Sequence, residues 1–306
     1  MIELIFLGTS ASAPSVQRGL SAHVVAYRDH RFLIDCGEGT QRQILRSGLG
    51  FRRLNRILIT HGHLDHILGL AGLLSTFMRW EAIESLEIWA GAWALERIHD
   101  LLFGVVLRGA RPPIDIQLRA IEAGTLLEDD GFRLSAFPVV HRGPGCFGFT
   151  FEEPSRRPFL AERAAALGVP PGPLRRDLVA GQRVVLADGS TVSPDEVLGP
   201  VRRGTRLVHI GDCARTEDLL EVCRGTDALV LEATYLDIEA DLAREFGHLT
   251  ARQAAELAAA AAVGHLYLTH VSRRHHEREV LLEASQVFPR VSVARDFDAF
   301  QIRRPD

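Results

Sequence analysis

The most constraining feature of the sequence is an H-x-H-x-D-H pattern inside an otherwise apolar run at residues 55–74. The pattern consists of His61, His63, Asp65 and His66, and it lies between a predicted buried strand (56–60) and a predicted helix (67–80). Burying an unpaired imidazole or carboxylate costs several kcal/mol. These side chains therefore need a partner, and a metal ion is the candidate; satisfied polar residues of a core are the alternative.

The rest of the chain alternates between predicted strands and helices, which indicates an α/β protein with helices covering sheets. Further strands are predicted at residues 2–8, 22–27, 31–37, 86–90, 132–140, 146–153, 206–212, 228–235, 265–270, 291–297 and 299–304. Further helices are predicted at 40–49, 92–105, 216–224, 250–262 and 276–288, with Thr250 as a candidate N-cap.

Three more polar side chains follow predicted buried strands, where α/β folds place their ligands: His141, Asp212 and His270. The full set can hold two ions, with His61, His63 and His141 on one, Asp65, His66 and His270 on the other, and Asp212 bridging them. Imidazole and carboxylate suit zinc or manganese. Two such ions about 3.5–4 Å apart can support an in-line displacement at phosphorus.

Other residues could assist that chemistry. Glu232 ends a predicted strand, and a histidine held by a carboxylate, here His248, could protonate a leaving alkoxide. A capping glutamate and a helix-start histidine are the alternative interpretation. Ser272, Arg273 and Arg274 lie just past the last candidate ligand, where they could touch phosphate or simply begin a solvated helix.

Residues 153–204 interrupt the alternation of elements and are rich in proline. A structureless surface insertion is one interpretation. The other is a projecting arm with structure of its own. Asp188-Gly189 between two β-rich runs is a hairpin pattern, and it favours the arm.

Composition limits the size of the core, the kinds of binding partner and the cellular compartment that the chain can have. The chain has 306 residues, 46% of them hydrophobic, so it can bury one large core or two ordinary ones. A net charge of −4 does not indicate nucleic-acid binding by bulk charge. The four scattered cysteines fit a reducing cytoplasm. No apolar run is long enough to span a bilayer, and the first run, which carries Glu3, is interpreted as a strand and not a signal peptide. We therefore expect a cytoplasmic protein without a membrane partner.

These motifs together resemble the metallo-β-lactamase superfamily and, within it, the ribonuclease Z family of tRNA 3′-processing endonucleases. The resemblance covers nearly the whole chain, through FLGTSASAP, LIDCGEGTQRQ, THGHLDHILGL, FPVVHRGPGCFGF, GVPPGP, IGDCART, LEATY, GHLTARQAA and LTHVSRR. It implies a single domain, residues 1–306, folded as a four-layer αββα sandwich with two Zn²⁺ per subunit, Mn²⁺ being possible. It also implies a homodimer, and an inserted exosite arm at residues 153–204 that grips the tRNA elbow and serves the partner's active site.

Carried over residue by residue, the seven ligands fall on the positions above. Asp65 matches the family's proton acceptor, Glu232 and His248 match the residues that protonate the leaving group, and Arg274 matches an arginine in phosphate contact. The loop 14–19 reads PSVQRG where the family usually has P-x-K-x-R-N, which puts its discrimination of CCA-bearing ends in question. In the arm, acidic residues nearly balance the arginines, so the pairs at 156–157, 175–176 and 202–203 are the candidate tRNA contacts.

The leading interpretation is a zinc-dependent endoribonuclease that removes the 3′ trailer from tRNA precursors and leaves a 3′-hydroxyl on the tRNA. The alternative is a metallo-β-lactamase-fold phosphodiesterase or ester hydrolase acting on a small substrate. A non-catalytic RNA-binding protein is a third possibility, against which the complete ligand set argues. The arm separates the first two, because a small-molecule enzyme gains nothing from a clamp on the tRNA elbow.

Overall fold

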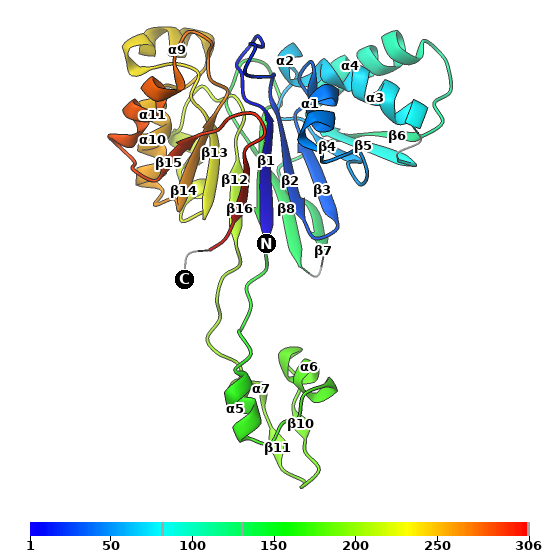
Figure 1. The fold of residues 1–306 in the computed structure, drawn as a ribbon, viewed down its shortest axis with the longest axis vertical. Helices are drawn as coiled ribbons and strands as arrows, with labels where there is room; N and C mark the ends of the chain where they lie inside the picture. Colours follow the sequence, from blue (N-terminus) through cyan, green and yellow to red (C-terminus); the bar gives the residue numbers. More distant parts are fainter. Residues whose placement is uncertain (81–82, 130, 305–306) are drawn as a thin grey trace. The chain divides into compact units, whose positions relative to one another are not determined.

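The computed structural model describes residues 1–80, 83–129 and 131–304 (Figure 1). Its backbone divides into two compact units. One consists of Met1–Glu152 together with Thr205–Asp306, and the other of Glu153–Gly204. The first unit holds both large sheets, and the second is the proline-rich insertion.

The first sheet has the strand order β16-β1-β2-β3-β4-β5-β6. The bounds are β16 Ala299–Ile302, β1 Ile2–Gly8, β2 Ala22–Tyr27, β3 His30–Ile34, β4 Arg56–Leu58, β5 Ser85–Ala90 and β6 Asp115–Ala120. Strands β16 to β3 pair antiparallel, and β3 to β6 pair parallel. The segments that follow β3, β4 and β5 therefore emerge at the same edge of the sheet.

The second sheet has the order β15-β14-β13-β12-β9-β8-β7. The bounds are β15 Val291–Val293, β14 His265–Thr269, β13 Ala228–Glu232, β12 Arg206–His209, β9 Phe147–Glu152, β8 Phe132–Pro138 and β7 Gly124–Asp129. Strands β12 to β15 pair parallel, and the others pair antiparallel. The segments after β12, β13 and β14 thus also share one edge.

Three buried apolar clusters define the layers of the first unit. One lies between the sheets and joins Leu4 and Phe32 of the first to Phe149 and Leu207 of the second. The second packs the first sheet against helices α1, α3 and α4, and the third packs the second sheet against α8, α10 and α11. Helices thus flank both sheets on the outside (Figure 1), and the predicted αββα sandwich is confirmed.

The helices of the first unit are α1 Thr40–Ser47, α2 Leu64–Ile67, α3 Gly69–Trp80, α4 Ala92–His99, η1 Asp100–Leu107, η2 Glu217–Leu219, α8 Leu220–Cys223, η3 Asp237–Glu239, α9 Ala240–Phe246, α10 Ala251–Ala260 and α11 Glu277–Ser285. Within the described ranges, no helix combines the length and apolar character needed to traverse a bilayer.

Two differences from the sequence-based expectation concern elements on the first unit's periphery. Strands β6 and β7 were not predicted; each lies at one edge of its sheet, and neither contains a fully buried residue. The predicted helix 92–105 is α4, which continues as the π-helix η1 to Leu107.

The second unit has secondary structure and a core of its own. Its elements are α5 Ala161–Ala166, α6 Pro173–Val179, β10 Val184–Val185, β11 Thr191–Val192 and α7 Pro194–Val197. Strands β10 and β11 pair antiparallel, so the hairpin predicted from Asp188-Gly189 is confirmed. The buried members of the core are Ala164, Val169, Leu178, Val184, Val192, Val197 and Leu198. This unit is therefore not a structureless insertion.

Candidate metal centre

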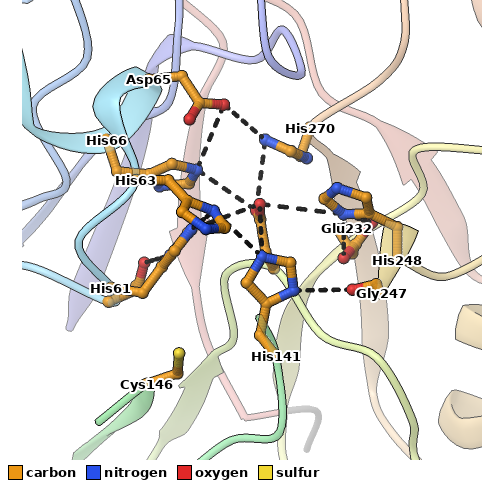
Figure 2. Close-up of polar contacts among 12 residues, drawn as sticks. His61, His63, Asp65, His66, His141, Cys146, Glu232, Gly247, His248 and His270 are labelled. Carbon is orange, nitrogen blue, oxygen red and sulfur yellow. Dashed lines mark hydrogen bonds and ion pairs between the residues drawn. The ribbon is translucent and has the colours of Figure 1, made fainter. Parts of the chain in front are cut away.

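The seven residues predicted as metal ligands lie together. Figure 2 shows six of them pointing toward one another: His61, His63, Asp65, His66, His141 and His270. His61 and His63 follow β4, Asp65 and His66 are in α2, His141 lies between β8 and β9, Asp212 follows β12, and His270 follows β14. Both sheets therefore contribute side chains to one place.

The first group consists of His61, His63, His141 and Asp212, whose ligand atoms all lie within 4.8 Å of one another. His63 Nδ1 is 2.9 Å from His61 Nε2 and 3.3 Å from His141 Nε2. Asp212 Oδ2 is 3.6 Å from Nε2 of both His61 and His141.

The second group consists of Asp65, His66 and His270. Asp65 Oδ2 is 3.7 Å from His66 Nε2 and 3.6 Å from His270 Nε2. The other oxygen of Asp212, Oδ1, is 3.4 Å from His66 Nε2 and 3.3 Å from His270 Nε2. The two oxygens of Asp212 thus face different groups, as a bridging carboxylate requires.

The donor atoms fit transition-metal ions. Four ligands that bind one zinc ion tetrahedrally at about 2.0–2.1 Å lie roughly 3.4 Å from one another, which matches the spacing found in both groups. His66 Nε2, His270 Nε2 and Asp212 Oδ1 are buried and have no hydrogen-bond partner among the described residues. Buried polar atoms rarely lack one, so these three atoms facing one point mark a position for a cation.

Hydrogen bonds behind the ligands hold two of the histidines in the tautomer that a metal needs. His66 Nδ1 is 2.8 Å from Asp35 Oδ2, and a carboxylate can only accept, so Nδ1 carries the proton. Thr60 donates its hydroxyl to the same carboxylate, so its oxygen accepts from His61 Nδ1 at 3.0 Å. In their neutral forms both rings therefore carry the proton on Nδ1 and present Nε2 to the centre.

The remaining two Nε2 ligands are held in the same way. His141 Nδ1 donates to the carbonyl oxygen of Gly247 at 2.7 Å. Thr234 donates its hydroxyl to Glu232 Oε2 and accepts from His270 Nδ1 at 3.0 Å. Ring orientation and proton position are thus set before any ion binds.

The electrostatics of the site favour neutral imidazoles in the first group and a protonated His66 in the second. Burial lowers the pKa of His63 to about 4, and it also holds the pKa of His61 well below its ordinary value. Burial acts to lower the pKa of His66 too, but the Asp212 and Asp35 carboxylates outweigh it and hold that pKa well above normal. The carboxylates that favour a second proton on His66 would equally favour a divalent cation at its Nε2, bound in exchange for that proton.

Glu232 and His248 form a hydrogen-bonded pair beside the ligands (Figure 2). His248 Nδ1 is 3.0 Å from Glu232 Oε1, and Glu232 is fully buried. Burial acts to lower the pKa of His248, but the Glu232 carboxylate outweighs it and raises that pKa to about 9. The imidazole is therefore held as a protonated acid with Nδ1 engaged, which leaves Nε2–H to donate.

The candidate phosphate contacts lie on the segment that follows β14. Ser272 Oγ accepts from the backbone N–H of Arg274 at 3.3 Å, and the Arg274 guanidinium is 3.1 Å from Glu239 Oε1. The loop after β1 pairs with this segment, since the Ala11 N–H donates to the Val271 carbonyl oxygen at 3.2 Å. In the same loop, the Ser12 N–H donates to Asp65 Oδ2 at 3.0 Å, so the loop also reaches the centre.

Sequence reasoning missed the groups behind the ligands, above all Asp35, Thr60 and Thr234. The sequence does contain one indication for Asp35, which comes directly after strand β3, just as several of the ligands come shortly after other strands. It is buried and has a φ of 58°, a left-handed backbone that aspartate tolerates better than most residues. The threonines carried no signal, since their role depends on which neighbours they touch.

Comparison with known proteins identifies the class first. Sequence profiles of the metallo-beta-lactamase superfamily and of a beta-lactamase superfamily domain match residues 18–157 and 193–271, respectively. Zinc-bound PqqB from Methylobacterium extorquens shares the fold, with a TM-score of 0.65 at 17% identity over 98% of this chain and 99% of that one. The sandwich and the paired His/Asp groups therefore define a member of the metallo-β-lactamase superfamily.

Two closer relatives identify the family. The chain is 49% identical to the ribonuclease Z of Bradyrhizobium diazoefficiens over 298 residues, 97% of this chain and 99% of that one. The crystal structure of human tRNase Z, short form, has a TM-score of 0.69 at 27% identity and covers 99% of this chain and 100% of that one. Within the superfamily, the chain belongs to the ribonuclease Z family of metal-dependent endoribonucleases, as its motifs predict.

Proposed function

We propose that this chain hydrolyses one phosphodiester bond in tRNA precursors, removing the 3′ trailer and leaving a 3′-hydroxyl on the tRNA. The observation that carries the proposal is the identity of 49% to a ribonuclease Z along nearly the whole chain. The paired His/Asp groups support it, because hydrolysis of a phosphodiester is chemistry that a two-metal centre favours.

The metal assignment is two Zn²⁺ per subunit, with Mn²⁺ as the other ion that the donor set suits. The first group would hold one ion and the second group the other, with Asp212 shared between them. When bound, such ions supply Lewis-acid activation of a water molecule and of the scissile phosphate.

Two side chains of the protein transfer the protons of the reaction. Asp65 accepts the proton of the attacking water, and the Ser12 N–H bond keeps its Oδ2 oriented toward the second group. His248 donates Nε2–H to the departing ribose oxygen, while Glu232 holds Nδ1. A ribose alkoxide is a poor leaving group, so a positioned acid contributes about 10²–10⁴-fold to its departure.

RNA binding is assigned to two regions. Arg274 and Ser272 would contact phosphates near the scissile bond. Residues 153–204 would form the exosite arm that grips the tRNA elbow, a role supported by the arm's own core and by its exposed arginines, Arg156, Arg176 and Arg202. Phosphate contacts of this kind supply affinity and register without reading sequence.

We further propose a cytoplasmic homodimer in which the arm of each subunit serves the active site of the other. The motifs shared with the ribonuclease Z family support the dimer. The four cysteines are free and buried, which supports a reducing compartment.

The direct test is to incubate the zinc-loaded protein with a labelled tRNA precursor and map the ends of both products. We expect a single cut at the 3′ end of the tRNA, a 3′-hydroxyl on the tRNA product, and loss of most activity in the His63→Ala variant. Cleavage by a preparation shown to contain no metal, or no cleavage of any precursor by the protein with two bound ions, would contradict the proposal.

A further inference from the structure

The first metal group is assembled from loops that belong to different sheets. His61 and His63 follow β4 of the first sheet, whereas His141 lies on the loop between β8 and β9 of the second. The spacing between these histidines therefore depends on whatever holds the two loops together. Helix α4, which follows β5, contacts both loops.

The contact centres on Trp93, a half-buried residue in the first turn of α4. Its ring stands edge-on to the imidazole of His63, with 5.9 Å between the ring centroids and 88° between the planes. The guanidinium of Arg97, one turn later, lies 5.2 Å from the Trp93 ring centroid. The indole is thus held between a ligand and a cation from its own helix.

Two glycines make room for this indole, one on each ligand loop. A Cβ at Gly62, between His61 and His63, would lie 3.0 Å from the Trp93 ring. A Cβ at Gly143, two residues after His141, would lie 2.9 Å from the same ring. The indole therefore fills a slot whose two walls are the backbones of the ligand loops.

Two backbone contacts complete the arrangement. Gly91, the N-cap of α4, approaches the His141 loop so closely that a Cβ on it would lie 2.2 Å from the carbonyl oxygen of Gly145. Arg97 donates to the carbonyl oxygen of Gly62 at 3.0 Å. One end of α4 thus contacts the His141 loop, while Arg97 contacts the His61–His63 loop.

We propose that Gly91, Trp93 and Arg97 form a clamp, the α4 clamp, that sets the distance between the histidines of the first metal group. Trp93 and Arg97 are positioning residues in this arrangement, since neither belongs to the ligand set. Asp65 is held instead by the Ser12 N–H, His66 by Asp35 and His270 by Thr234, so the clamp acts on the first ion selectively. The inference rests on the proposed two-metal centre.

The test is a titration of the metal-free protein with Zn²⁺ against a competing chelator. For Trp93→Ala we expect one of the two ions to bind about 10–100-fold more weakly, as is typical when a residue behind a metal ligand is lost, and the other to bind as before. With Co²⁺ bound in place of Zn²⁺, the absorption spectrum of the Trp93→Ala variant should match that of the His63→Ala variant and not that of the His270→Ala variant. Trp93→Phe should recover most of the affinity.

Trp89→Ala is the matched control. Trp89 lies on β5, has Arg119 at 5.1 Å from its ring, and packs against the core between the sheets. If Trp93→Ala does not fold, Arg97→Ala tests the same clamp through its bond to Gly62. Wild-type affinity for both ions in the clamp variants, or equal weakening of both, would overturn the clamp. Failure of the wild-type protein to bind two ions would instead overturn the proposed two-metal centre, on which the clamp proposal rests.

Discussion

At the scale of the residue, one carboxylate connects the acid to a metal ligand. Glu232 Oε1 accepts from the Cys213 N–H at 2.7 Å and from His248 Nδ1 at 3.0 Å. Its Oε2 accepts the hydroxyl of Thr234, which in turn orients His270. Loss of Glu232 should therefore affect both metal binding and proton donation, whereas loss of His248 should affect only the second.

The first prediction separates those two roles. His248→Ala should retain both ions and bind precursor tRNA nearly normally, but its kcat on RNA should fall by about 10²–10⁴-fold because the alkoxide leaves unprotonated. An aryl phosphodiester, whose phenolate leaves without help, should lose far less. His99→Ala, an exposed histidine, is the control. Equal loss on both substrates with two ions bound would assign His248 to holding the phosphate.

A second prediction concerns Asp35, whose carboxylate accepts from Thr60 and from His66 Nδ1. Asp35→Asn keeps the size and the left-handed backbone, but it places an NH₂ group against one of these donors. We expect metal affinity to fall by about 10–100-fold, measured by chelator competition. Asp29→Asn, at an exposed carboxylate paired with Arg53, should bind metal normally. Unchanged affinity in Asp35→Asn would show that the His66 tautomer is set elsewhere.

The candidate ligands were predictable because each obeys a local rule: a polar residue directly after a buried strand, or a polar cluster at the start of a helix. The groups behind them obey no such rule. Thr60 and Thr234 act through neighbours that β4 and β13 bring beside them only in the folded chain. Trp93 is similar, since a tryptophan near the start of an amphipathic helix predicts a core contact and not a slot between two glycines.

At the scale of the element, the start of α10 shows how local sequence fixes a boundary. Thr250 Oγ1 accepts from the Gln253 N–H at 3.2 Å, and the Gln253 side chain accepts from the Thr250 N–H at 2.9 Å, so the predicted N-cap is confirmed as a capping box. Strands β6 and β7 were not predicted: each lies at one edge of its sheet, pairs with one neighbouring strand and contains no fully buried residue.

The third prediction tests that cap. Thr250→Ala should lower the free energy of unfolding by about 1 kcal/mol, because the Gln253 N–H at the helix start loses its side-chain acceptor. Denaturant unfolding measures the change, and the metal content should stay at two ions because neither Thr250 nor Gln253 belongs to the ligand set. Thr125→Ala, on the exposed edge strand β7, should change stability much less. Equal stability of the two variants would mean that packing alone positions α10.

At the scale of the whole molecule, the arm is a second unit with its own apolar core. Within two of its arginine pairs, the two side chains make different contacts. Arg157 pairs with Asp195 at 2.6 Å, and Arg175 donates to the carbonyl oxygen of Val169 at 2.9 Å, so both stabilise the arm itself. Their neighbours Arg156 and Arg176 are exposed. The pairs 156–157 and 175–176 thus each consist of one arginine that holds the arm and one exposed arginine, whereas both members of the pair 202–203 are exposed.

The last prediction follows from this division. Glu152 and Arg206 are direct partners on β9 and β12, so a short Asn-Gly turn can replace residues 154–203 without disturbing the sheet. This variant should keep two ions and hydrolyse an aryl phosphodiester normally, while its KM for precursor tRNA rises roughly tenfold or more, because the phosphate contacts of the arm are lost. In the full-length protein, replacing Arg156, Arg176 and Arg202 by Ala should weaken tRNA binding and reduce the slope of log affinity against log salt by about 2–3. The matched control is Arg52→Ala, at an exposed arginine of the first unit, which should leave that slope unchanged. If the arm-deleted variant loses activity equally on tRNA and on the aryl substrate, the arm belongs to the catalytic unit, and tRNA recognition must be sought on the first unit instead.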